Sequence, residues 1–163
     1  MKTIQTPRFN TRWFEDNDWR NVMEVALDWS KAPGPKFDKW PTAEDEVKGF
    51  TSHLVSSQKY WAVISLERKT VVGLLVVNGI QDGMADLGHV LHSEIQDGKQ
   101  DLEILTAFVD VLFESEDIKG IFAYNDPAHR EQIRPLLEMG FKAEDGNEGK
   151  LTVLREDYDK VAQ

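Results

Sequence analysis

The chain has 163 residues, 40% of them hydrophobic and 29% charged, with a net charge of −10. This length suits one domain over residues 1–163, and the composition is typical of a globular protein. The lack of cysteine excludes disulfides, thiolate metal sites and a cysteine nucleophile. Nucleic-acid binding relies on Lys and Arg, so the acidic balance disfavours that partner and suits a cationic ligand such as an amine, although solubility alone would also explain it.

The sequence also lacks the usual signals of a membrane or metalloprotein. No apolar run approaches the roughly 20 residues that span a bilayer, and residues 1–8 lack the apolar core of a signal peptide. We therefore expect a cytoplasmic protein with no membrane partner. His53, His89, His92 and His129 show no metal-ligand spacing, so no metal site is predicted.

The first third of the chain predicts one strand and two helices. A strand is expected at residues 9–14, followed by a helix that Asp18 caps and whose apolar residues recur at three- and four-residue spacing. Residues 32–35, Ala-Pro-Gly-Pro, interrupt the chain. The second helix is expected to begin near Thr42.

From residue 60 the hydrophobic period changes from 3.6 towards two. We expect strands at 60–66, 71–77, 84–92 and 121–125, helices at 102–114 and before Gly140, a hairpin of 141–145 with 151–155, and a solvated tail at 156–160. Strands and helices do not alternate strictly. The prediction is therefore a mixed α/β, α+β-like domain with one central, mostly antiparallel sheet of about six or seven strands and about four helices.

Four segments, in order and at suitable spacing, resemble the GNAT acetyltransferases. They are Tyr60-Trp61-Ala62-Val63-Ile64, Ala85-Asp86-Leu87-Gly88-His89-Val90-Leu91-His92, Asp126-Pro127 followed by Ile133-Arg134, and Glu138-Met139-Gly140-Phe141. The resemblance covers almost the whole chain and is greatest to the branch of ribosomal-protein-alanine acetyltransferases. It implies a GNAT-like fold and acetyl-CoA as co-substrate.

The resemblance also implies where acetyl-CoA would bind. In that family the strand matching 85–92 diverges from its neighbour, and its free backbone groups, here at Val90, Leu91 and His92, pair with the pantetheine arm. His129 stands where many members have an asparagine that helps to hold this arm. The following loop binds the pyrophosphate, and its pattern falls on Gln96, Asp97, Gly98, Lys99, Gln100 and Asp101.

This loop departs from the family pattern. Lys99 and Asp101 replace two small residues, and the one glycine, Gly98, comes a position early. We expect Asp101 to be the N-cap of the next helix, where its carboxylate would take the amides that phosphates need and would repel them. Two alternatives stay open: weak acetyl-CoA binding, or a loop that its own aspartate closes.

Acetyl transfer to an amine needs a group that removes a proton. His89 and Asp86 lie on the strand that lines the reaction centre in the family and are the candidate catalytic residues, although alternation points them to opposite faces. Trp29, Phe37 and Trp40 cluster at the first two helices, where the family binds its acceptor, and suit a cationic amine or a peptide N-terminus. A purely structural role is the alternative for each.

The leading hypothesis is an acetyl-CoA-dependent N-acetyltransferase that acts on an amine of a small molecule or of a protein N-terminus. The alternative is a GNAT-fold module with impaired cofactor binding that acts as a non-catalytic ligand-binding or interaction protein. A GNAT-like homodimer with only a structural role is a third alternative.

Overall fold

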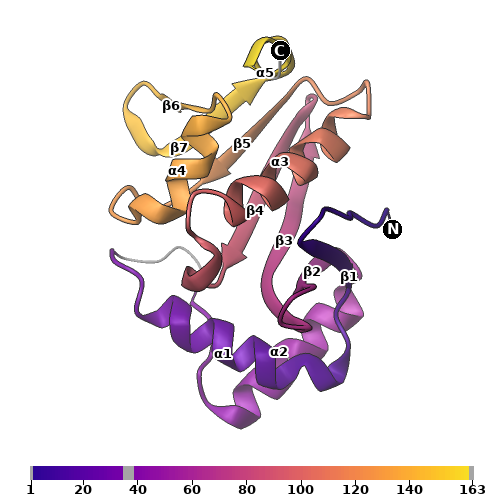
Figure 1. The fold of residues 1–163 in the computed structure, drawn as a ribbon. Coiled ribbons are helices and arrows are strands. Elements are labelled where there is room, and N and C mark those ends of the chain that lie inside the picture. The colour runs from indigo at the N-terminus through magenta and orange to yellow at the C-terminus, as the bar shows by residue number, and fades with distance from the viewer. Residues whose placement is uncertain (1, 35–38, 162–163) are drawn as a thin grey trace.

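The computed structural model describes residues 2–34 and 39–161, which contain one seven-stranded sheet (Figure 1). The strands are β1 Phe9–Trp13, β2 Tyr60–Ser65, β3 Thr70–Gln81, β4 Met84–Leu91, β5 Gly120–Tyr124, β6 Lys142–Glu144 and β7 Asn147–Leu154. Their order across the sheet is β1-β2-β3-β4-β5-β7-β6, and only the pair β4–β5 is parallel. The predicted mixed fold with a mostly antiparallel sheet is confirmed.

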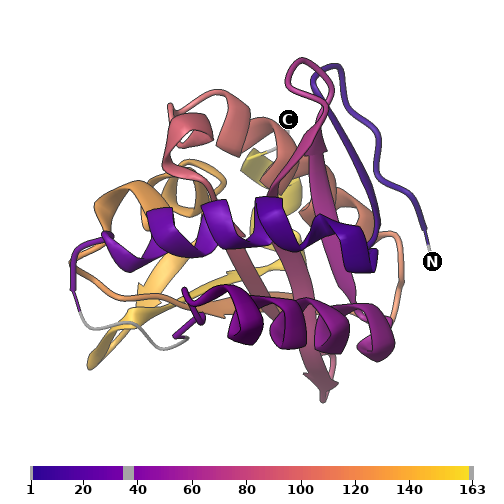
Figure 2. The same ribbon diagram turned by 90° about the horizontal axis from the view of Figure 1, so that it is seen from below.

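Helices cover both faces of this sheet. The α-helices are α1 Trp19–Ser30, α2 Glu44–Ser57, α3 Gln100–Phe113, α4 Arg130–Glu138 and α5 Arg155–Val161, and the two 3-10 turns are η1 Asp16–Asp18 and η2 Ser93–Ile95. Figure 2 shows α1 and α2 side by side across one face, while α3 and α4 pack on the other. None of the described helices is long and apolar enough to span a membrane.

Alternation along β3 explains why two separate cores form. Leu74 packs with Val22 and Leu54 under α1 and α2, whereas its neighbour Leu75 packs with Leu105 under α3. Successive side chains of a strand point to opposite faces, so an apolar strand in the middle of a sheet supplies both cores.

The pairing of β4 with β5 stops early. Only three residue pairs join the two strands, Met84–Gly120, Ala85–Ile121 and Asp86–Phe122. On its other edge, β4 stays paired with β3 as far as Leu91. The two strands therefore separate beyond Asp86, as the sequence predicts, and Figure 1 shows β5 running away from β4.

Several element boundaries differ from those expected. Helix α3 begins at Gln100, so Asp101 lies inside its first turn and is not its N-cap, contrary to the prediction. Asp18 does stand at the N-cap position of α1, but its carboxylate binds Arg12 and the amide of Glu15 and makes no capping bond to α1. Helix α2 starts two residues later than expected, at Glu44.

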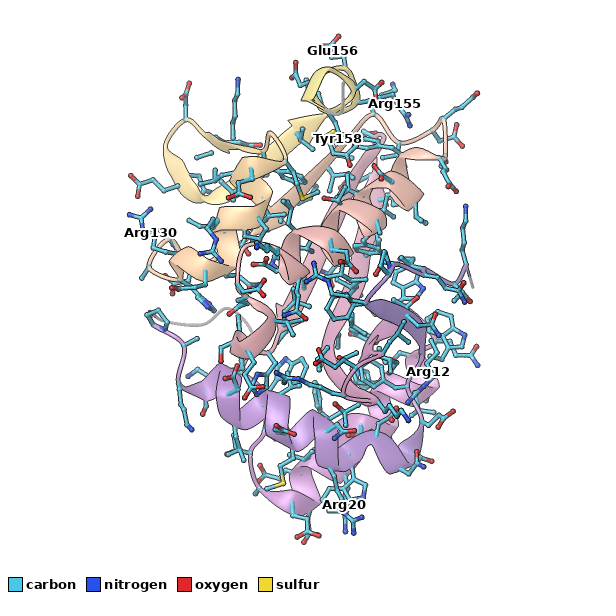
Figure 3. The ribbon with its side chains drawn as sticks, viewed as in Figure 1. Arg12, Arg20, Arg130, Arg155, Glu156 and Tyr158 are labelled. Carbon is cyan, nitrogen blue, oxygen red and sulfur yellow. The ribbon has the colours of Figure 1, made fainter. Side chains whose placement is uncertain are left out.

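The expected solvated tail at residues 156–160 is wrong, because these residues belong to α5. The Tyr158 side chain is buried against Phe113, and its hydroxyl donates to Oδ1 of Asp110 at 2.5 Å. The Arg155 guanidinium donates to main-chain carbonyls at the end of α3 and just past it, including that of Ile118 at 2.7 Å. Both labelled side chains turn inward from α5 (Figure 3), so α5 holds the end of α3.

We predict that Tyr158→Ala lowers the free energy of unfolding by about 3 to 5 kcal/mol, as expected for the loss of a buried aromatic ring. The matched control is Tyr124→Ala, since half of the Tyr124 side chain is exposed, and its cost should not exceed about 1 kcal/mol. Urea unfolding monitored by circular dichroism measures both values. Equal costs would show that α5 does not support the core.

Candidate functional site

A cavity of about 280 Å³ lies where β4 and β5 separate. It is open on one side, and its walls come from the middle of β4, the end of β5, the chain after α1 and the start of α4. The lining residues are Trp29, Pro33, Asn78, Asp86, Leu87, Gly88, His89, Val90, Tyr124, Asn125, Asp126, His129 and Gln132. The structure therefore brings five of the predicted site residues to one cavity: Trp29, Asp86, His89, Val90 and His129.

The backbone of β4 faces this gap at alternate residues. The amide of His92 donates to the carbonyl of Val72 on β3 at 2.8 Å, and the backbone groups of successive residues in an antiparallel strand point to opposite edges. Val90 and His92 therefore face β3, whereas His89 and Leu91 face the gap. Of the three residues expected to pair with the pantetheine arm, only Leu91 is placed to do so.

Gln132 of α4 bridges the gap and was not predicted from the sequence. Its side-chain amide donates to the carbonyl of His89 at 2.6 Å and accepts from the side chain of Gln96 at 3.0 Å. Its three-residue spacing from His129 was the one available signal, because residues so spaced share a helix face. Gln132 thus satisfies a strand carbonyl that β5 leaves unpaired.

His89 is buried, and its Nε2 lies 3.2 Å from the carbonyl oxygen of Gln132. A carbonyl only accepts, so Nε2 carries the proton in this pair. Burial lowers the pKa of His89 to about 4, although the bond to Gln132 opposes this shift, and nearby His129 lowers it further. The neutral ring is therefore a weak base at neutral pH. A catalytic role for His89 or for Asp86, which lies three residues earlier and lines the same cavity, stays a prediction.

Asp97, and not Asp101, holds the start of α3. Its Oδ1 accepts the amides of Lys99 at 2.9 Å and Gln100 at 2.7 Å, and its Oδ2 accepts the Gln100 side chain at 2.9 Å. Slight burial acts to raise the pKa of Asp97, but these hydrogen bonds outweigh it and lower the pKa to about 2. Gly98 has a φ of +84°, which explains the glycine at this turn.

Asp101 is fully buried, with 0% of its surface exposed. Its Oδ1 accepts the amide of Leu102 at 2.9 Å, while its Oδ2 has no hydrogen bond and lies 3.6 Å from Nη2 of Arg134. Burial raises the pKa of this carboxyl group despite the bond from Leu102 and the charge of Arg134. The Asp101 carboxyl group therefore lies inside the protein and faces Arg134 of α4.

The predicted aromatic cluster is only partly within the described residues. Trp29 and Trp40 line one hollow of about 600 Å³ beside α1, and Phe37 lies outside the part of the chain that the structure describes. Trp29 packs against the ring of His129 at 5.3 Å and Trp40 against Phe50 at 5.0 Å. Their role in acceptor binding stays a prediction.

The two parts of the predicted cofactor site fit acetyl-CoA differently. The gap beside β4 offers backbone groups and space to an extended thioester arm. The loop at residues 96–101 does not fit a pyrophosphate, because Asp97 takes two of its amides and Asp101 adds a second carboxylate. Among the described residues, no group of three or more His, Asp or Glu side chains could hold a metal ion.

No protein-family model matches the sequence, and no curated protein matches it. Solved structures match over nearly the whole chain. A GNAT-family acetyltransferase from Bacillus anthracis has a TM-score of 0.76 at 21% identity and covers 95% of this chain and 99% of its own. The chain has the GNAT fold.

Two further structures with the GNAT fold are similar to this chain. The ribosomal-protein-S5-alanine acetyltransferase of Vibrio fischeri has a TM-score of 0.72 at 16% identity, covering 97% of this chain and 99% of its own. Mycobacterium smegmatis RimJ, solved in complex with CoA-disulfide, has a TM-score of 0.71 at 15% identity, covering 95% and 87%. The fold is thus shared at low sequence identity.

We predict that His89 makes stability depend on pH. Its pKa is about 4 in the folded chain and near 6.5 when unfolded, so the unfolded chain binds the proton first. The free energy of unfolding should therefore fall as the pH falls from about 6.5 to about 4, by up to about 1.4 kcal/mol per pH unit from this residue.

Urea unfolding at a series of pH values tests this, with His89→Gln expected to reduce the slope. His53→Gln removes a histidine with an exposed side chain and should leave the slope unchanged. Equal slopes for the wild type and His89→Gln would show that the buried ring is not neutral in the folded protein.

Proposed function

We propose that the protein is an N-acetyltransferase that transfers an acetyl group from acetyl-CoA to an amine of a small molecule or of a protein N-terminus. The observation that carries the proposal is the separation of β4 from β5 after the pair Asp86–Phe122. This separation leaves an open cavity beside strand backbone that no neighbouring strand pairs with. The acetyltransferases that share the fold support the same reading.

The residues around the cavity suit this reaction. Acetyl-CoA, when bound, supplies the acetyl group as a thioester. The backbone groups of His89 and Leu91 point into the gap, where they can orient an extended amide chain as an added strand would. Gln132 must then release the carbonyl of His89, since one side-chain amide already fills that position.

The acceptor side of the cavity suits an amine. Asp86 lines the cavity and can attract an ammonium group, and Trp29 offers an aromatic face to a cation. The amine must lose a proton to attack the thioester carbonyl, and Asp86 can accept it directly or through water. As the C–N bond forms, the C–S bond of the thioester breaks and coenzyme A would leave as the free thiol. The net charge of −10 favours the approach of a cation.

A second candidate function is a non-catalytic module that binds a ligand in the same cavity. Two contacts favour it. Gln132 occupies the carbonyl of His89, and Asp97 occupies the amides of Lys99 and Gln100, so side chains of the protein itself take positions that a cofactor would use.

Measuring whether the protein cleaves acetyl-CoA in the presence of an amine distinguishes the acetyltransferase from the non-catalytic module. We predict release of free thiol from acetyl-CoA when the protein is mixed with a diamine, an arylalkylamine or a short peptide with a free N-terminus. The same peptide with an acetylated N-terminus is the control and should give no thiol. An absence of turnover with every amine, together with no thermal stabilisation by millimolar acetyl-CoA, would support the non-catalytic module.

We predict that Asp86→Asn lowers kcat/KM for the amine by about 100-fold, the usual lower limit for loss of acid–base assistance. Thermal stabilisation by acetyl-CoA should not change, because Asp86 is assigned to the acceptor. The matched control is Asp82→Asn, an exposed residue in the turn before β4, with activity unchanged. An active Asp86→Asn variant would remove Asp86 from the mechanism.

A further inference from the structure

In the loop between β4 and α3, the carboxylate of Asp97 occupies the amides at the start of α3. Asp97 accepts three hydrogen bonds, from the amides of Lys99 and Gln100 and from the side chain of Gln100. Free amides at the start of a helix are the usual seat of a phosphate. Here the Asp97 carboxylate occupies the position of such a phosphate, and its pKa of about 2 keeps it ionised near neutral pH.

One further amide between β4 and the loop also binds a carboxylate. The main-chain amide of Ser93, two residues after β4, donates to Oδ2 of Asp28 at 2.9 Å, and the Ser93 hydroxyl donates to Oδ1. A cavity of about 500 Å³ lies beside Ser93 and Gln96. Two acidic residues, Asp28 and Glu131, and one basic residue, Lys31, are among its lining residues. The amide of Ser93 and the two loop amides are thus all occupied by carboxylates of the protein itself.

The cations near the loop do not outweigh these acids. Arg134 donates from Nη2 to the carbonyl of Gln96 at 2.9 Å and lies 3.6 Å from the buried carboxylate of Asp101. Lys99 is exposed at the mouth of the loop. The Asp97 carboxylate therefore lies beside the exposed Lys99 and offsets its charge, and Arg134 is already engaged by the Gln96 carbonyl and by Asp101.

We infer that the loop at residues 96–101 does not bind pyrophosphate, and that the protein recognises its acyl donor through the thioester arm in the gap beside β4. Only the identity of the donor rests on the proposed function. The consequence for specificity is that a nucleotide should add little to donor affinity. An acyl thioester on a pantetheine arm without the nucleotide should bind about as tightly as acetyl-CoA.

Calorimetry with inorganic pyrophosphate tests the loop independently of any acetyltransferase activity. The wild type should give no binding heat at millimolar pyrophosphate. Asp97→Ala frees two amides and removes a charge, so it should bind pyrophosphate at least about tenfold more tightly. Asp145→Ala makes the same change of charge in the exposed turn between β6 and β7 and should gain nothing.

The variant Asp97→Asn removes the negative charge but keeps an oxygen that can bind the two amides, so it distinguishes the effect of the charge from that of the occupied amides. Its Oδ1 can still accept both amides, so it should gain much less than Asp97→Ala. An equal gain for the two variants would overturn the claim that filled amides exclude the anion. Binding of pyrophosphate by the wild type, or no gain in a folded Asp97→Ala variant, would overturn the inference as a whole.

A second comparison uses acetyl-CoA and S-acetyl-pantetheine with the wild type. Dissociation constants within about threefold of each other support the inference, and a preference for acetyl-CoA of about 100-fold would contradict it. Failure of the proposed function has a different signature. In that case neither thioester binds and no amine is acetylated, while the pyrophosphate results still decide the state of the loop.

Discussion

Only three residue pairs join β4 to β5, and this short pairing creates the cavity on which the proposed function depends. A parallel pair that continued to Leu91 would satisfy the backbone of both strands and leave no opening. Because pairing stops at Asp86 and Phe122, strand carbonyls beyond that point need other partners. The cavity and the availability of the β4 backbone to a ligand both follow from this early end of pairing.

Gln132 shows how the fold meets that need without a ligand. Its amide bonds to the carbonyl of His89, and its oxygen accepts from Gln96, so one side chain links the strand, α4 and the loop. A ligand that pairs with β4 must offer hydrogen bonds at least as good as those of Gln132, since a buried carbonyl left without a partner costs about 1 to 3 kcal/mol. An amide-containing arm can meet this requirement.

Much of the fold could be predicted from the sequence. The change of hydrophobic period at residue 60 placed β2 to β4, and the resemblance across residues 60–141 placed the separation of β4 from β5. Helix α5 was missed because residues 155–161 are mostly charged, and the contacts of Tyr158 and Arg155 that hold it in place are made with distant residues.

The candidate site was harder to predict, because its contacts join distant parts of the chain. Asp97 and Asp101 are both acidic and four residues apart, so an uncertainty of two residues in the start of α3 decides which one caps the helix. The low pKa of His89 depends on burial beneath α4, and the bridge made by Gln132 depends on the packing of α4 against β4. The burial of His89 has no local sequence signal, and the spacing of Gln132 from His129 does not indicate which strand Gln132 contacts.

The central claim is that the donor binds in the gap beside β4 and displaces Gln132. A two-dimensional ¹H–¹⁵N spectrum recorded with and without millimolar acetyl-CoA tests it most directly. We expect the signals of the His89 and Leu91 backbone amides and of the Gln132 side-chain amide to shift, while those of the Lys99 and Gln100 amides stay in place. Shifts centred on Lys99 and Gln100, with the amides of β4 unchanged, would contradict it.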